Sequence, residues 1–424
     1  MSTAVDLTTF LENRALFIPW IDPGSGITSH ILTPHSEHRI APHQQSFYYL
    51  NPSFTADTLK YWFYCAFPPT PARSLGVVDF QRQTLRHFPE TCFTSAPMID
   101  PSTDDVYWAT LSGIWKLASP TANFVAATTP QLVNRFPASI VRNRTVHRYA
   151  THLTMTADRK ALFIDSQIGS DCVLGLAPLD GSEIEILQSV PLSPHPHPTL
   201  NHGQANPIDS GLFLVAHDYY TNPQTGVVRP YDNRLWLIRR GGQVAPVYPT
   251  AAQAGPDRAI SSINPHLSDP EASRRTITDP RAMHGHEWWS ADGRHIYYIH
   301  YQTGIERTPI ATACTPDARP ELIWPHDTVS HAHASADGKL FVLDALPPDA
   351  PDTHHVRFVN LHTRRTVDIV SKFPALSDPE LRRYHVHPHP QFCGADQFIC
   401  YTTTIFGRMD VAFVRVSELL TATS

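Results

Sequence analysis

The stretch HEWWSADGRHIYYIHY, residues 286–301, has the pattern of a β-hairpin and decides the fold. Its two halves are rich in aromatic and β-branched residues, and the Asp292-Gly293 pair between them is typical of a tight turn. The pattern returns along the chain, in copies near residues 51–67, 96–110, 152–165, 202–217, 286–301, 331–345 and 389–403. Seven copies of one hairpin indicate a repeat architecture.

Most copies are followed by a further short strand, such as NRLWLIRR from Asn233 or HVRFVNLH from His355. Each repeat therefore predicts an antiparallel sheet of three or four strands. Seven such sheets with almost no helical periodicity predict an all-β fold, a seven-bladed β-propeller that occupies residues 1–424 as a single domain. The alternative, two β-sandwiches in tandem, does not explain why the same hairpin returns seven times.

The composition narrows the classes of partner. The formal net charge of the 424 residues is −6, and Lys and Arg are scattered rather than clustered, which argues against nucleic acid. No apolar run approaches the roughly 18–20 residues that span a bilayer, and the N-terminal residues lack the pattern of a secretory signal. We expect a cytoplasmic monomer or dimer that binds neither nucleic acid nor membranes. The six cysteines form no CxxC pair, which predicts free thiols.

Five copies carry a histidine six or seven residues before the turn aspartate or its equivalent. In a propeller this position lies near the start of a strand close to the axis, so the side chains are expected to converge on one funnel. Any single one fits a structural role that caps a strand, but five in one register favour metal binding, catalysis or both. The first copy has Asn51 there instead, with His43 a little upstream. The five histidines are His152, His202, His286, His331 and His389.

The segment VHPHPQF, residues 386–392, places His387 beside the aligned His389 and restrains the backbone around both. His387 and His389 lie at i and i+2 on an extended segment and therefore share one face. Pro388 and Pro390 keep the segment extended and reduce the entropy lost when both histidines bind one ion. Together with His286, they would supply three nitrogens and leave coordination positions open, as in a catalytic metal site.

Four motifs resemble those of the oligogalacturonate lyases: GHEWWSADGRHIYY (285–298), SHAHASADGKLFVLD (330–344), VHPHPQF (386–392) and NHGQANPIDSGLFLVAHD (201–218). The resemblance implies a seven-bladed propeller that cleaves uronic-acid oligosaccharides by β-elimination with a divalent cation, manganese or calcium. It implies His286, His387 and His389 as metal ligands. The family's fourth ligand, a Gln three residues ahead of HPHP, corresponds to Tyr384, so His331 or water completes the site, the metal differs, or it is absent. A related group of lyases that remove rhamnose from glucuronate makes that uronate the alternative substrate.

β-Elimination at a uronide requires a group that neutralises the carboxylate, a base for the C5 proton and an acid for the leaving oxygen. His202 is the predicted base, although a structural role also fits it. Arg148 and Tyr149, just ahead of His152, are candidates for carboxylate binding and leaving-group protonation. The predicted catalytic set is His202, Arg148, Tyr149 and His152, and the predicted substrate contacts are His43, His217, Arg234, Tyr384 and Trp288.

Two other functions stay open at this point. A glycoside hydrolase needs two carboxylates that face each other across the bond, and Glu287 is expected on the opposite face of its strand from His286. A propeller that serves only as a binding scaffold has no need of matched histidines in five blades. No G-x-S-x-G motif occurs, which argues against a serine hydrolase.

Overall fold

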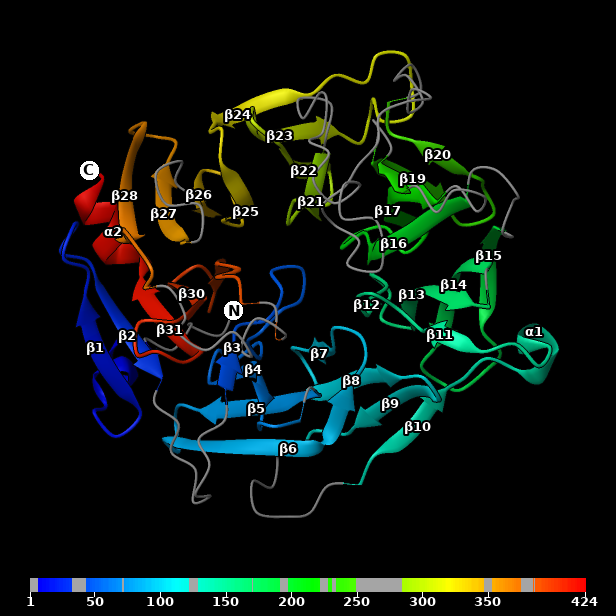
Figure 1. The fold of residues 1–424 in the computed structure, drawn as a ribbon, viewed down its shortest axis with the longest axis horizontal. Helices are drawn as coiled ribbons and strands as arrows, with labels where there is room; N and C mark the ends of the chain where they lie inside the picture. Colours follow the sequence, from blue (N-terminus) through cyan, green and yellow to red (C-terminus); the bar gives the residue numbers. More distant parts are fainter. Residues whose placement is uncertain are drawn as a thin grey trace.

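The computed structural model describes residues 7–32, 43–70, 72–121, 129–169, 171–190, 197–221, 228–230, 234–248, 284–346, 353–374, 384 and 386–424. Seven antiparallel sheets stand in a ring around a central axis, as the blades of a propeller (Figure 1). Within the described ranges, the α-helices are α1 (Ala138–Val141) and α2 (Val416–Ala422), and a 3-10 helix spans Leu7–Glu12. The predicted all-β, seven-bladed β-propeller is confirmed.

The first three blades in chain order precede residue 191. The first contains β3 (His43–Gln45), β4 (Lys60–Ala66), β5 (Arg73–Asp79) and β6 (Thr84–Phe93). The second contains β7 (Met98–Asp100), β8 (Asp105–Thr110), β9 (Gly113–Leu117) and β10 (Gln131–Asn134). In the third, β11 (Val146–Arg148) and β12 (Thr154–Met155) both pair with β13 (Ala161–Ile168), followed by β14 (Asp171–Pro178) and β15 (Glu185–Val190).

The next three blades repeat this arrangement. The fourth contains β16 (His197–Ala205), β17 (Leu212–Thr221), β18 (Val228–Pro230), β19 (Leu235–Arg239) and β20 (Val244–Pro246). The fifth contains β21 (His284–Trp289), β22 (His295–His300), β23 (Gly304–Pro309) and β24 (Glu321–Pro325). The sixth contains β25 (Val329–Ala334), β26 (Leu340–Ala345), β27 (His355–Asn360) and β28 (Arg365–Val370).

The seventh blade joins the two ends of the chain. Its inner strands are β29 (Gln391–Cys393), β30 (Phe398–Thr403) and β31 (Asp410–Arg415), and its outer strands are β1 (Phe17–Ile21) and β2 (Thr28–Leu32). Strand β2 pairs with β31 through His30 opposite Phe413, and Figure 1 shows β1 and β2 beside β31. This shared sheet closes the ring, and the seven hairpins seen in the sequence did not predict the N-terminal strands.

Neighbouring blades pack face to face, which explains why their strands are apolar on both sides. Phe163 of β13 stacks on Phe213 of β17 with 4.5 Å between ring centroids. Trp62 of β4 packs with Trp108 of β8 and donates to Asp104 in the second blade. The residues of β4 beyond its first are all buried. This packing fixes the inner strands around the axis, where the candidate site lies.

All six cysteines are free thiols. Among the described residues, no helix is long and apolar enough to cross a membrane.

Candidate functional site

The five aligned histidines occupy equivalent places in their blades. In four blades, the histidine lies four residues before the residue whose N–H closes the hairpin turn, which is Thr156, Asn206, Ser290 or Ser335. His389 lies two residues before the start of β29, and Ala96 lies two residues before the start of β7. A cavity of about 340 Å³ is lined by Ala96 and by His152, His202, His286, His331 and His389.

Local backbone distortion accompanies three of these side chains. His202, His286 and His389 have φ angles of 50°, 51° and 42°, in the left-handed region that residues with a Cβ rarely adopt. The pairing of β16 with β17 and of β21 with β22 shifts register at His202 and His286. A β-bulge bends its strand and re-aims a side chain. Strain of this kind gathers at functional sites, so these bulges mark the histidine cavity as one.

A donor set that fits a metal ion lies at one side of the cavity, with His331 and His389 in the cavity lining and His387 next to them. The ligand atoms of His331, His387 and His389 all lie within 4.8 Å of one another. The ring centroid of His331 lies 4.4 Å from that of His389 and 4.0 Å from that of His286. His331 thus belongs to the cluster, and His286 lies beside it. We call His331, His387 and His389 the metal wall.

Asp344 on β26 holds the metal wall in place. This carboxylate is fully buried, and it accepts hydrogen bonds from the backbone N–H of His331 at 2.9 Å and of His389 at 3.2 Å. Nδ1 of His331 lies 3.0 Å from both of its oxygens. Because the carboxylate accepts the Nδ1 proton, Nε2 of His331 carries the lone pair that ligates a cation. The residues present therefore fit a divalent cation.

The opposite wall contains His152 and His202, with ring centroids 5.3 Å apart, and we call this pair the proton wall. Nδ1 of His202 lies 2.8 Å from Oδ1 of Asn201, which favours the tautomer with the proton on Nδ1. Tyr48 connects the walls: its ring stacks on His152 at 4.7 Å and meets His389 edge-on at 5.0 Å. It comes from the first blade, which lacks the aligned histidine.

Burial keeps these imidazoles neutral. It lowers the pKa of His152 to about 3, and the nearby charges of Arg148 and Arg234 act in the same direction. Burial likewise lowers the pKa of His202 and of His286 well below the usual range. Neutral imidazole is the form that accepts a proton or binds a cation. Burial also raises the pKa of the Tyr48 hydroxyl, which therefore stays protonated at neutral pH.

Arg148 and Tyr149 do not line the cavity. The Arg148 guanidinium donates to the backbone carbonyls of Asp165 and Leu200, each at 3.0 Å. The Tyr149 side chain is buried between blades, where its hydroxyl accepts from the Phe136 N–H at 3.1 Å. Adjacent residues on an extended chain face opposite ways, so closeness to His152 in sequence does not bring both side chains to the site.

Arg234 and Glu287 form a buried ion pair beside the histidines, with 2.9 Å between Nε and Oε2. Glu287 is not among the described residues that line the cavity. His217 also lies outside the cavity lining, where its ring meets Trp236 edge-on at 4.7 Å. Burial lowers the pKa of His217 to about 3.

Tyr384 stands where the resemblance has a glutamine ligand, but its side chain points elsewhere. Its hydroxyl donates to the backbone carbonyl of Thr70 at 2.6 Å, and its ring lies 5.9 Å from that of His43. Neither Tyr384 nor His43 is among the described residues that line the cavity. The position next to His387 and His389 is occupied by His331 instead.

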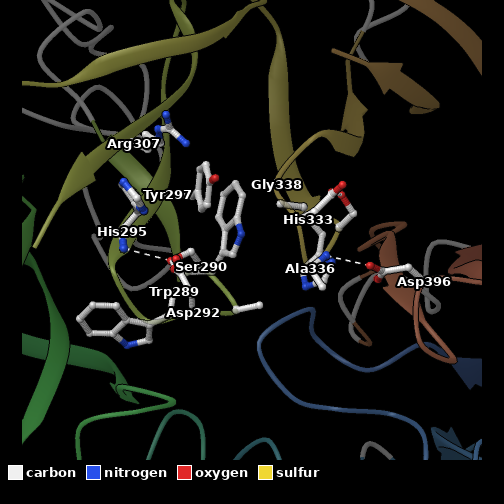
Figure 2. Close-up of a pocket in the computed structure, with 15 residues that line it drawn as sticks. Trp289, Ser290, Asp292, His295, Tyr297, Arg307, His333, Ala336, Gly338 and Asp396 are labelled. Atoms are coloured by element: carbon white, nitrogen blue, oxygen red, sulfur yellow. Dashed lines mark hydrogen bonds between the residues drawn. The ribbon is translucent and has the colours of Figure 1, made fainter. Parts of the chain in front are cut away.

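Trp288 belongs to a different pocket, formed by the hairpin turns at the opposite ends of the inner strands (Figure 2). This pocket has a volume of about 270 Å³, and Asp396 lies across it from Trp289. Trp288 is 3% exposed and stacks on Tyr297 at 5.3 Å. Trp288 therefore packs in the core and does not line the histidine cavity.

Sequence reasoning missed one positively charged side chain that lines the cavity. Arg73 on β5 is the one arginine among the described lining residues, and it donates to Oε1 of Gln45 at 3.2 Å. Its guanidinium lies over the rings of Tyr64 and Phe93, at 5.2 and 5.5 Å from their centroids. Stacking of this kind fixes the planar group and leaves donors for a ligand carboxylate. No motif marks Arg73, because its place follows from the strand register of the first blade, where it pairs with Ala66 and Phe93.

No protein-family model and no curated protein matches the sequence. An oligogalacturonate lyase in complex with manganese matches the structure at a TM-score of 0.66 and 16% identity, over 94% of this chain and 96% of its own. The chain has the oligogalacturonate lyase fold. The oligogalacturonate lyase from Vibrio parahaemolyticus matches with the same TM-score, identity and coverage. At this identity the likeness establishes the fold, and an activity must be argued from the cavity itself.

Proposed function

We propose that the protein is a carbohydrate lyase that cleaves a glycosidic bond at a uronic acid by β-elimination. The observation that carries this proposal is the pairing of two walls in one cavity. Three imidazoles that fit a cation, with Asp344 behind them, face His152 and His202, which are neutral and not tied to a carboxylate. The substrate classes are an oligogalacturonide or a rhamnosyl-glucuronate glycan.

The C5 proton of a uronide becomes removable when the charge of the neighbouring carboxylate is neutralised. Arg73 is placed to bind that carboxylate through its remaining guanidinium donors. A divalent cation held by His331, His387 and His389 would add Lewis-acid stabilisation of the negative charge that develops there. Calcium prefers oxygen ligands, which counts against it at three imidazoles, and manganese is the metal bound by an oligogalacturonate lyase of similar fold.

His202 serves as the base in this scheme. Its Nε2 accepts the C5 proton, because Nδ1 donates to Asn201. The electrons of the C5–H bond form the C4–C5 double bond, and the C4–O4 bond breaks. The Tyr48 ring lies between His152 and His389, and its hydroxyl gives its proton to the departing O4 and regains one from solvent. The product is an unsaturated uronate.

The test is to incubate the protein with oligogalacturonides and with rhamnosyl-glucuronate glycans and to record the ultraviolet absorbance of the unsaturated product. Parallel samples are treated with a chelator and then resupplied with Mn²⁺. Absorbance that falls on chelation and returns with Mn²⁺ is expected. No absorbance from any uronide by a folded protein overturns the proposal. New reducing ends without absorbance would indicate hydrolysis.

A further inference from the structure

A second group of potential metal ligands lies on the fifth blade. His284 of β21 is the direct cross-strand partner of His300 of β22, and their ring centroids lie 4.7 Å apart. Glu306 of β23 is two residues beyond Gly304, the partner of His300, and therefore shares its face of the sheet. The ligand atoms of the three side chains lie within 4.8 Å of one another.

The surroundings of this group enclose the carboxylate. Glu306 is 6% exposed, and its Oε1 lies 3.0 Å from Nδ1 of His300. Its Oε2 is buried and makes no hydrogen bond to the described residues.

A buried carboxylate needs compensation by charge or by several hydrogen bonds. Nδ1 of His300 lies within hydrogen-bonding distance of Oε1, and Oε2 has no hydrogen-bond partner among the described residues. The ring of His284 stands on the same face, within ligand distance of both other groups. Two imidazole nitrogens and one carboxylate oxygen form a common ligand set for Zn²⁺ and Mn²⁺.

We propose that His284, His300 and Glu306 form a second divalent-cation site, distinct from the metal wall. A cation there links β21, β22 and β23 at the end of the blade where His286 enters the histidine cavity. The second site thus acts as a structural clamp that fixes the start of β21. It does not depend on the lyase proposal, because it shares no ligand with the metal wall.

The experiment counts metal ions per chain by mass spectrometry after equilibrium dialysis against Zn²⁺ or, separately, Mn²⁺. Four proteins are compared: the wild type, H387A/H389A, H284Q/E306Q, and E321Q as a control on the exposed edge of the same blade. We expect two ions in the wild type and in E321Q, and one in each double variant. Each variant is checked for folding by circular dichroism.

Two ions retained by H284Q/E306Q, or none bound by H387A/H389A, would overturn the second site. A wild type that binds one ion, lost in H284Q/E306Q and kept in H387A/H389A, supports the second site and counts against the metal wall. If H284Q/E306Q does not fold, a Co²⁺ titration of H387A/H389A replaces it. Visible absorption that saturates at one equivalent is then expected, and no absorption would overturn the site.

Discussion

Each wall of the histidine cavity has a buried aspartate at the same position of its blade, and the two aspartates have different hydrogen-bond partners. Asp344 in the sixth blade and Asp165 in the third each lie four residues after the residue whose carbonyl accepts the hydrogen bond that closes the hairpin turn, and both are fully buried. Asp344 accepts from the side chain and backbone of His331 and from the backbone of His389. Asp165 accepts from the hydroxyl and backbone of Thr151 and from the Gly203 N–H.

The difference lies in what the carboxylate does to its histidine. On the metal wall, the charge of Asp344 acts directly on the ring of His331 and makes Nε2 a stronger ligand. On the proton wall, Asp165 accepts its hydrogen bonds from Thr151 and Gly203. It makes no hydrogen bond to the ring of His152 or His202. One scaffold position thus serves a wall whose residues fit a cation and a wall of neutral imidazoles.

The largest effect is expected from H202Q, which removes the proposed base. A missing general base costs about 10²–10⁴-fold in turnover, and the glutamine amide cannot take up the C5 proton. The affinity for Mn²⁺ should stay unchanged, because His202 lies on the other wall. Turnover of oligogalacturonide or rhamnosyl-glucuronate measures the first effect and calorimetry the second. H355Q, a buried histidine outside the cavity, is the control; equal turnover in H202Q and wild type would contradict the assignment.

D344N should weaken metal binding at the metal wall and leave the proton wall unchanged. The uncharged amide no longer supports the ring of His331, and loss of such a partner weakens metal affinity about 10–100-fold. D165N removes the equivalent carboxylate from the proton wall and should leave Mn²⁺ affinity within error of the wild type. Calorimetric titration of both variants makes the comparison, and equal losses in both would show that the walls are not specialised.

The parts of the molecule that could be predicted from the sequence follow from local periodicity. Counting back from each turn places five histidines at one position, because every blade repeats the same hairpin around one axis. The pairing of β2 with β31 could not be read in this way, since it joins segments almost a whole chain apart. Tyr48 is hidden for a similar reason, because its contacts with His152 and His389 join different blades.

Proximity in sequence was the weaker guide to the site. Tyr149, Tyr384 and Trp288 stand next to the right motifs, but each side chain packs into the core on the other face of its segment. Asp344 carries a signal that was available, since LFVLD and ALFID place Asp344 and Asp165 at the same point of two repeats. An acid repeated at an inward position therefore marks a buried partner for the residues around it, which is a histidine side chain for Asp344 and Thr151 for Asp165.

R73Q tests substrate binding, because Arg73 belongs to neither the metal wall nor the proton wall. The glutamine keeps one donor but loses the charge, so we expect KM for a uronide to rise about tenfold, the scale of one charge-assisted hydrogen bond. The Mn²⁺ affinity should not change. Steady-state kinetics provides the measurement, with R82Q on an exposed turn of the same blade as control. A fall in kcat with KM unchanged would instead place Arg73 at the reacting bond.

The smallest effect concerns histidines that lie outside the walls. Burial lowers the pKa of His355, in the sixth blade, to about 4. Between this value and the unfolded pKa near 6.5, the unfolded chain binds the proton that the folded chain excludes. The stability is therefore fully present above pH 6.5, and His355 removes about 1.4 kcal/mol for each pH unit below it.

Urea unfolding of the wild type and H355Q at several pH values between about 4.5 and 7.5, which covers most of the window between these two pKa values and extends above it, isolates this contribution. The free energy of unfolding should fall less steeply with acid in H355Q than in the wild type. H362Q, which replaces an exposed histidine, should follow the wild type. Parallel curves for all three proteins would mean that His355 protonates in the folded state, and that neutrality of the buried imidazoles is confined to the cavity walls.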